Sequence, residues 1–309
     1  MASPESGQIR ATLVNDRETL DVPLAVQRQE WLAAAVQVQL PPNITIAPID
    51  VAGMPGEWVN SPAVGPQQVL LYLHGGGYNA GSCVTHRDLA ARLCLASGVR
   101  VLLLDYRLAP EHPFPAAVHD TVAAYQWLLA CGTPPEQIVM GGDSSGGGLA
   151  LAAMLWLREH ALALPTAGVL LSPWLDLTLT GSSIQTHAAI DPLVSPESLR
   201  LAASYYMGDA DPKTPLASPV YADLRGLPPL LIQVGAHEVL LSDSTRLAEQ
   251  ARAVGVDVTI EVWDAMWHVW HAWAEVLPEG KQAIQRIGAF IRQQFARNQL
   301  VRSPLPARH

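Results

Sequence analysis

Short apolar runs alternate with longer stretches of helical periodicity along most of the chain. Val69–Leu73 is apolar at every position, as expected for a strand that helices cover on both faces. The runs interpreted as strands of one parallel sheet are Val69–Leu73, Val101–Asp105, Gln137–Met140, Gly168–Leu171, Leu230–Val234 and Val258–Val262, preceded by an antiparallel pair at Ile44–Val51 and Glu57–Asn60. The intervening helices are predicted at Asp88–Ala96, Ala116–Ala130, Leu149–Glu159, Ser242–Val254 and Lys281–Arg297. Repeated strand-helix alternation predicts an α/β fold.

Two segments depart from this alternation and predict a cap. Thr19–Leu40 has a helical pattern ahead of the first strand, and Leu179–Ala217 is rich in Pro, Ser and Asp, with a short helical piece at Pro196–Tyr206. We therefore expect cap helices within residues 1–45 and a cap insertion at residues 179–217. The predicted catalytic domain comprises residues 46–178 and 218–309.

Composition narrows the class of partner. The chain has 309 residues, 49% of them hydrophobic, which is enough for one large core. A net charge of -9 argues against nucleic acid or an anionic membrane as partner, and a small molecule fits better. Three cysteines without zinc-type spacing, and an N-terminus without a basic region followed by an apolar core, favour a cytoplasmic protein. We expect no stable membrane insertion.

The sequence Gly142-Asp143-Ser144-Ser145-Gly146 places a serine between two glycines where an apolar run gives way to a helical pattern. A serine on such a sharp strand-to-helix turn is a nucleophile elbow, because its strained backbone requires neighbours without side chains. Alone, the pattern is also compatible with a glycine-rich turn that holds a buried serine. Ser144 is therefore the candidate nucleophile.

A second glycine-rich loop, His74-Gly75-Gly76-Gly77, follows the run Val69–Leu73. Residues without side chains let backbone amides approach a substrate oxygen closely. The candidate oxyanion-hole donors are the amides of Gly76, Gly77 and Ser145.

A base for Ser144 is expected after the last strand, because in hydrolases with a nucleophile elbow the nucleophile, the acid and the histidine follow in that order along the chain. His268 satisfies that order, and His271 is its rival, one turn further on if the segment is helical. For the acid we prefer Glu238, which follows the run Leu230–Val234. Asp243 is placed to begin or cap the next helix, and Asp264 reads as a turn residue.

Together, His74–Gly77, the run Asp105–Ala117, the elbow and the late His268 resemble the hormone-sensitive lipase family of α/β-hydrolases, in its bacterial carboxylesterase branch. The resemblance extends from about Val69 to Trp270. It implies an eight-stranded, mostly parallel sheet with a helical cap, and hydrolysis of short- to medium-chain acyl esters. The family's catalytic residues fall on Ser144, His268 and Glu238.

The chain departs from the family pattern at two positions. The family acid is usually aspartate, and the glutamate at position 238 leaves Asp243 as a substitute. Ser145 stands where the family commonly has alanine, and since only its amide is needed, we expect little effect of the hydroxyl.

Two further groups of residues are expected mainly to stabilise the fold and not to take part in catalysis. In the run Asp105–Ala117 we expect an ion pair of Asp105 or Glu111 with Arg107, and some cis proline bonds. Four tryptophans recur around His268 and are expected to pack, although Trp270 could equally line the acyl pocket. They are Trp263, Trp267, Trp270 and Trp273.

The sequence thus predicts a cofactor-free and metal-free serine carboxylesterase acting on a small acyl ester, with amide hydrolysis open to the same machinery. A ligand-binding relative without activity is one alternative, which an intact elbow and His268 disfavour. A metal hydrolase using His268, His271 and Glu275 is another, although no His-Glu-x-x-His pattern occurs. The final strand, Val258–Val262, would be a plausible edge for a homodimer.

Overall fold

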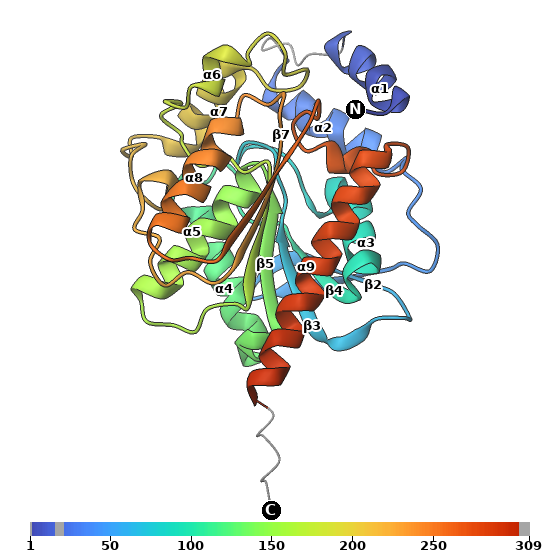
Figure 1. The fold of residues 1–309 in the computed structure, drawn as a ribbon, viewed down its shortest axis with the longest axis vertical. Coiled ribbons are helices and arrows are strands. Elements are labelled where there is room, and N and C mark those ends of the chain that lie inside the picture. The colour runs from blue at the N-terminus through green and yellow to red at the C-terminus, as the bar shows by residue number, and fades with distance from the viewer. Residues whose placement is uncertain (1, 16–21, 303–309) are drawn as a thin grey trace, which may run out of the picture.

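An eight-stranded sheet forms the centre of the structure, a computed structural model that describes residues 2–15 and 22–302 (Figure 1). The strand order is β1-β2-β4-β3-β5-β6-β7-β8. Strand β2 is antiparallel to both neighbours and all other pairs are parallel, which confirms the predicted fold class. The strands are β1 Thr45–Val51, β2 Met54–Asn60, β3 Gly65–Leu73, β4 Val99–Leu104, β5 Ile138–Asp143, β6 Ala167–Leu171, β7 Leu230–Gly235 and β8 Val258–Trp263.

The helices agree with the predicted alternation, and α1 lies ahead of the predicted Thr19–Leu40 helix, within residues 1–45 where helices were expected. The helices are α1 Pro4–Asn15, α2 Leu24–Ala35, α3 Cys83–Ser97, α4 Ala116–Ala130, α5 Ser145–Glu159, α6 Ser183–Thr186, α7 Pro196–Met207, α8 Leu241–Ala253 and α9 Pro278–Arg302. Short 3-10 turns are η1 Pro135–Gln137, η2 Pro219–Tyr221 and η3 Trp270–Trp273. Residues 19–21, the start of the predicted Thr19–Leu40 helix, lie outside the described residues, as do residues 303–309. Among the helices described, none is long and apolar enough to cross a membrane.

Alternate side chains of the central strands enter two separate cores. Leu71 and Leu73 of β3 point toward the face covered by α4, α5 and α8, whereas Leu70 and Tyr72 point toward the face covered by α3 and α9. All four side chains are fully buried. This two-sided burial explains why β3 is apolar at successive positions, as a strand covered on both faces must be.

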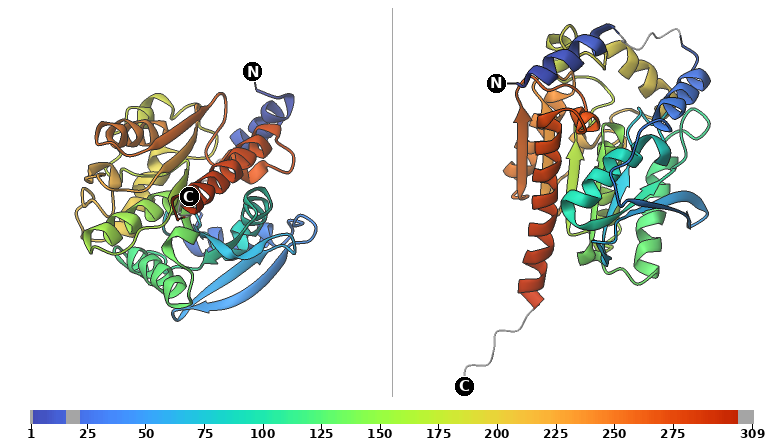
Figure 2. Two further views of the ribbon diagram at one scale, coloured as in Figure 1. Left: turned by 60° about the horizontal axis from the view of Figure 1, so that its bottom comes forward. Right: turned by 90° about the vertical axis from the view of Figure 1, so that its right-hand side faces the viewer.

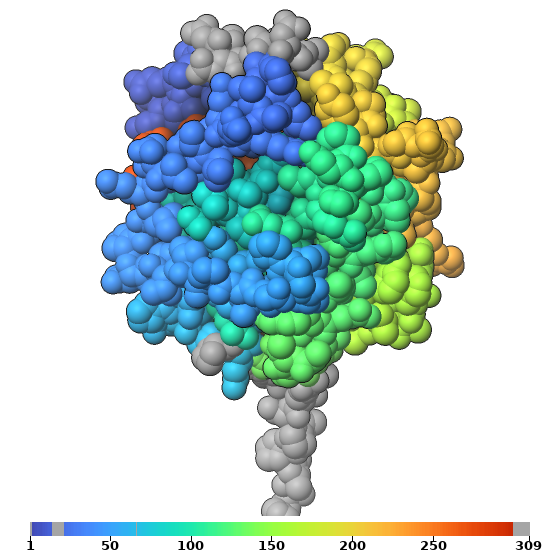
Figure 3. Space-filling view, turned by 180° about the vertical axis from the view of Figure 1, so that it is seen from behind, coloured from blue at the N-terminus to red at the C-terminus, as the bar shows by residue number. Residues whose placement is uncertain are grey.

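Helices α1, α2, α6 and α7 gather at one end of the molecule, where the strands end (Figures 1 and 2). Seen from behind, the segments of α2 (blue) and of the insertion (yellow) lie at that same end (Figure 3). Side chains fix α1 there, because Ser3 donates from its amide to Glu279 at 2.6 Å and Arg10 contacts both His237 and the carbonyl of Ile190. The helices thus lie over the end of the sheet at which parallel α/β folds carry their sites.

The edges of the sheet are formed by β1 and β8. Val262 on β8 is half exposed. A strand with an unpaired edge can pair with a second copy, so β8 is available for the expected homodimer contact, which stays a prediction.

The long C-terminal helix α9 packs directly against α3 at Gly288. A Cβ at this position would overlap the carbonyl of Ala96 at the end of α3. Glycine in a helix interior lowers the stability of the helix by about 1 kcal/mol relative to alanine. The close packing of α9 on α3 is the physical reason for a glycine at position 288.

We predict that Gly288→Ala lowers the stability of the protein despite its better helix propensity, because the methyl group forces α9 away from α3. Overpacking of this kind costs about 1–3 kcal/mol. The matched control is Gly7→Ala in α1, where nothing lies within 4 Å of the added Cβ and no loss is expected. Urea denaturation of both variants tests this, and equal stability of parent and Gly288→Ala would contradict the packing argument.

Candidate active site

Ser144 lies on the turn between β5 and α5 with φ 52° and ψ -123°, a left-handed conformation that a side chain rarely adopts. A Cβ on Gly142 or on Gly146 would overlap the carbonyl of Leu73 at the end of β3. Ser144 is partly exposed, whereas Asp143 and Ser145 on either side are buried. The turn therefore presents one hydroxyl outward, as a nucleophile elbow does.

The glycine loop after β3 packs against this turn. Gly76 and Gly77 have φ of 119° and 63°, values that favour glycine, and a Cβ at Gly76 would overlap the carbonyl of Ala80. Ser145 is the first residue of α5, so its amide has no acceptor within its own helix. The Ser145 hydroxyl accepts a hydrogen bond from the amide of Tyr78 at 3.2 Å. This hydroxyl, from which we expected little, thus ties the glycine loop to the elbow.

His268 pairs with Glu238, and both lie at the end of the sheet where the strands terminate. Its Nδ1 is 3.0 Å from Glu238 Oε2, and both side chains are buried. The other carboxylate oxygen, Oε1, accepts from the Ser172 hydroxyl and the Gly235 amide, each at 2.6 Å. Ser172 in turn accepts from the amide of Val269 at 3.1 Å. The Glu238 carboxylate is therefore fixed from both of its oxygens.

The electrostatic setting of His268 suits a proton acceptor. Burial lowers its pKa, but the hydrogen bond and charge of Glu238, and the charge of Asp191, outweigh burial and leave the pKa raised. With Nδ1 facing the carboxylate, Nε2 is the nitrogen that can take up a proton. The pair has the chemistry of a general base and the acid that orients it.

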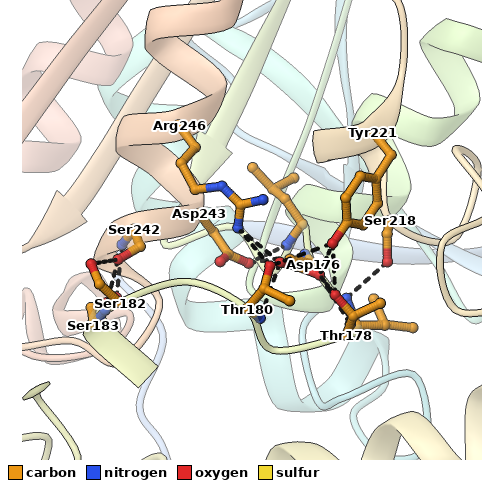
Figure 4. A network of polar contacts seen from close by, with 12 residues as sticks. Asp176, Thr178, Thr180, Ser182, Ser183, Ser218, Tyr221, Ser242, Asp243 and Arg246 are labelled. Carbon is orange, nitrogen blue, oxygen red and sulfur yellow. Dashed lines mark hydrogen bonds and ion pairs between the residues drawn. The ribbon is translucent and has the colours of Figure 1, made fainter. Parts of the chain in front are cut away.

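Asp243, the second candidate acid, binds backbone amides and does not contact His268. It lies buried in the first turn of α8, where its Oδ2 accepts from the amides of Leu175 at 2.8 Å and Asp176 at 3.0 Å (Figure 4). Burial and the nearby charge of Asp176 raise the pKa of Asp243 to about 7. Asp264, the third candidate, is exposed. Of the three carboxylates, Glu238 is the one that contacts His268.

Asp176 extends this second polar cluster across the loop that follows β6. Its carboxylate accepts from Thr178 and Thr180 and pairs with Arg246 of α8 at 2.8 Å, as Figure 4 shows. Tyr221 adds a further hydrogen bond at 3.3 Å. The cluster joins the start of the predicted insertion to α8 and does not include His268.

His271, the rival base, is also engaged. Its Nε2 lies 2.8 Å from the side-chain oxygen of Gln233, and burial lowers its pKa to about 3. Glu275 is exposed and lies 3.7 Å from Arg92. In the described parts of the chain no three His, Cys, Asp or Glu side chains gather to hold a metal ion. The metal-hydrolase alternative therefore has no site at these residues.

The tryptophans around His268 form a packing cluster. Trp267 and Trp270 are fully buried with Met266, Leu277 and Ala283, and Trp263 and Trp273 pack against them. The geometry thus favours packing over pocket lining for Trp270.

The expected ion pair of Arg107 with Asp105 or Glu111 is wrong. Arg107 pairs with Asp120 of α4 at 2.7 Å, and Glu111 pairs with Arg28 of α2 at 2.7 Å. Asp105 accepts from the amide of Cys83 at 2.6 Å. The expectation considered only carboxylates within the run, whereas both partners come from helices. Two proline bonds, Ala109-Pro110 and Phe114-Pro115, are cis as expected.

Two residues that contact the candidate site were not foreseen. Ser172 directly follows β6, so the same rule that selected Glu238, its position after a strand, would have identified it. Asp191 comes from the insertion and accepts from the amide of Val239, next to Glu238, at 2.9 Å. No local pattern marks Asp191, because its contact depends on how the insertion folds back.

Comparison with known proteins assigns the chain to a family. Residues 70–272 match the family described as alpha/beta hydrolase fold. An acetyl-hydrolase of Streptomyces hygroscopicus is 49% identical over 253 residues, which cover 81% of this chain and 84% of that protein. The crystal structure of an esterase from the bacterial hormone-sensitive lipase family has a TM-score of 0.92 and 49% identity, covering 96% of this chain and 99% of that one. The crystal structure of EstE5 soaked with p-nitrophenyl butyrate has a TM-score of 0.92 and 46% identity, covering 96% and 100%. The chain belongs to the α/β-hydrolase family, in the group related to hormone-sensitive lipase.

Proposed function

We propose that Ser144, His268 and Glu238 are the catalytic triad of this chain, which is a carboxylic ester hydrolase. The observation that carries the proposal is the buried His268–Glu238 pair at the end of the sheet where Ser144 occupies a strained turn. A serine, a histidine and an acid in these roles form the machinery of acyl transfer. The relatives named acetyl-hydrolase and esterase support the same chemistry.

In the proposed first step, Ser144 Oγ attacks the ester carbonyl carbon while His268 Nε2 takes the hydroxyl proton. Glu238 holds the imidazole through Nδ1 and stabilises the imidazolium that forms. The carbonyl oxygen becomes an oxyanion, which the amides of Gly76, Gly77 and Ser145 would stabilise. Each such donor contributes on the order of 10²–10³ to the rate.

The tetrahedral intermediate then collapses. The bond to the alcohol oxygen breaks, His268 returns its proton to that oxygen, and an acyl group remains on Ser144. A water molecule repeats the sequence, giving its proton to His268 and its oxygen to the acyl carbon. The carboxylic acid leaves and Ser144 regains its proton, so the cycle needs no cofactor.

A preference for short and medium acyl chains is part of the proposal. Helix α7 approaches the glycine loop closely, since a Cβ at Gly77 would meet Ala202 Cβ at 3.1 Å. Tyr206 of α7 stacks on Tyr78 with ring centroids 3.8 Å apart. An acyl chain lying beside the loop must share this space with α7. The acyl groups associated with two relatives are short: one is named acetyl-hydrolase, and crystals of EstE5 were soaked with p-nitrophenyl butyrate.

We expect Ser144→Ala to lower kcat for p-nitrophenyl butyrate by roughly 10⁶-fold, because the nucleophile is lost. The comparison is Ser145→Ala, which keeps its backbone amide but loses the hydrogen bond from Tyr78, so a loss of about tenfold at most is expected. Steady-state hydrolysis and labelling of the protein by an organophosphonate measure both effects. Equal activity of Ser144→Ala and an active parent would reject the serine mechanism, and an inactive parent would favour the ligand-binding alternative.

Glu238→Gln should lower kcat by roughly 10²–10⁴-fold, since the amide no longer holds the imidazolium. The base must be neutral, so kcat/KM falls as pH drops through the pKa of His268. Because Glu238 raises that pKa, its neutralisation should move the acidic limb of the pH profile to lower pH.

The control for this prediction is Asp243→Asn, which should stay within about tenfold of the parent and leave the acidic limb in place. A greater loss in Asp243→Asn than in Glu238→Gln would show that Asp243 is the functional acid.

With p-nitrophenyl esters from acetate to palmitate, we expect the highest kcat/KM at eight carbons or fewer. Tyr206→Ala should move this optimum to longer chains, because it removes the ring that stacks on Tyr78. Its partly buried neighbour provides the control, and Tyr205→Ala should leave the optimum unchanged. A parent that prefers palmitate would contradict the proposed chain-length limit.

A further inference from the structure

A further polar cluster, largely buried, contacts the glycine loop. It brings together side chains from five parts of the fold: Tyr72 of β3, His74 in the loop, Tyr106 after β4 and Asp143 at the end of β5, all buried, and the partly buried His86 of α3. His74 stacks on Tyr106 with ring centroids 4.3 Å apart, and its carbonyl accepts from the Tyr106 hydroxyl at 2.7 Å. The proton-transfer steps above make no use of this cluster.

Asp143 is the centre of the cluster, and its carboxylate binds the backbone of the glycine loop. Its Oδ1 accepts from the Tyr72 hydroxyl at 2.8 Å and from the Gly75 amide at 3.2 Å. A Cβ at Gly75 would overlap the carboxylate, so glycine is required for this approach. Gly75 immediately precedes Gly76 and Gly77, and its position therefore sets where their amides lie.

The carboxylate of Asp143 also creates an electrostatic problem. It is buried next to Ser144, beside the place where the proposed oxyanion forms, and a buried charge without a counter-charge is costly and would repel that anion. His74 does not supply the counter-charge, because burial and the charge of His86 lower its pKa to about 4. Arg87 does not either, since it turns away to Glu57.

His86 is placed to supply it. Its Nε2 lies 3.4 Å from Asp143 Oδ2. The Gly75 amide points both to His86 Nε2, at 3.3 Å, and to Asp143 Oδ1, at 3.2 Å. A neutral ring with an unprotonated Nε2 accepts from this amide, whereas an imidazolium leaves the amide to Asp143 alone. On the opposite side of the ring, Nδ1 lies 3.3 Å from the carbonyl of Ser82 and 2.8 Å from the Thr85 hydroxyl. A ring that donates from Nδ1 to the Ser82 carbonyl and from Nε2 to the Asp143 carboxylate is an imidazolium, and this is the form that the proposal below requires.

The titration behaviour agrees with this geometry. Burial lowers the pKa of His86, but the charge and hydrogen bond of Asp143 outweigh burial and leave it raised. Burial raises the pKa of Asp143, but the charge of His86 and the hydrogen bonds from His86 and Tyr72 leave it lowered. Each partner thus favours the charged form of the other.

We propose that His86 is a positioning residue for ester hydrolysis: it balances the charge of Asp143 and so holds the glycine loop, residues 74–77, in the geometry that stabilises the oxyanion. The inference rests on the proposed function of that loop. His86 touches neither substrate nor Ser144 in this role. It acts through Asp143 and Gly75.

The test is a set of three variants: His86→Gln, Asp143→Asn and the double variant that carries both. His86→Gln leaves a buried carboxylate without its counter-charge, so we expect kcat for p-nitrophenyl butyrate to fall about 100-fold with KM changed less than threefold. The inhibition constant of an alkyl boronic acid, which binds as a tetrahedral anion, should rise by a similar factor. The control His119→Gln removes an exposed histidine of α4 and should match the parent.

The double variant separates charge compensation from packing. Removing both charges is far less costly than stranding one, so the double variant should recover at least tenfold in kcat over His86→Gln, and Asp143→Asn alone should be the mildest of the three. If His86→Gln does not fold, a double variant that folds and is active supports the proposal in the same way, because removing both charges then restores what removing one has lost. A double variant no more active and no more stable than His86→Gln overturns the proposal.

Two further outcomes also overturn it: a His86→Gln enzyme within threefold of the parent, and equal weakening of substrate and boronate binding. Labelling of the parent by an organophosphonate keeps this test apart from the proposed function. A parent not labelled at Ser144 contradicts the serine mechanism itself. If the parent is labelled at Ser144 but His86→Gln has the kcat of the parent, only the proposed role of His86 is rejected.

Discussion

The close approach of two backbone turns is the constraint on which the rest of the site depends. The turn after β5 and the loop after β3 meet so tightly that a single methyl group on Gly142, Gly146 or Gly75 would overlap the neighbouring strand end or carboxylate. Because β3 and β5 are adjacent in the sheet, their carboxyl ends bring the two segments together. The strained conformation of Ser144 is maintained by this packing, since nothing local would favour it.

The same constraint explains why the remaining site residues arrive from distant parts of the chain. Once the two turns occupy the ends of β3 and β5, the loops that follow the later strands β6, β7 and β8 end at the same edge of the sheet. Glu238 follows β7 and His268 follows β8, and Ser172 after β6 joins them by accepting from Val269 and donating to Glu238. Residues that follow three successive strands therefore form one hydrogen-bonded unit, and the order of the strands in the sheet determines its geometry.

The parts that could be predicted from the sequence are those that depend on local chemistry or on strand order. Apolar runs located the central strands within a few residues, and the glycines around Ser144 marked the elbow because their absence of side chains is a steric requirement. The partner of Arg107 and the contact of Asp191 with Val239 could not be predicted in this way. Both depend on how separate helices and the insertion pack, and packing between distant segments leaves no periodic signal in either one.

Two buried carboxylates, Asp143 and Glu238, each contact a histidine, yet the two pairs differ in which ring nitrogens remain available. His268 meets Glu238 with one nitrogen, so its other nitrogen can exchange a proton during turnover. His86 is in hydrogen-bond range of polar groups at both nitrogens, so it has no free position for proton exchange. In the roles proposed here, the same chemical pair serves as a proton relay where one side of the ring is open and as a charge balance where both sides face polar groups. What decides between the two roles is the backbone around each ring, and not the identity of the residues.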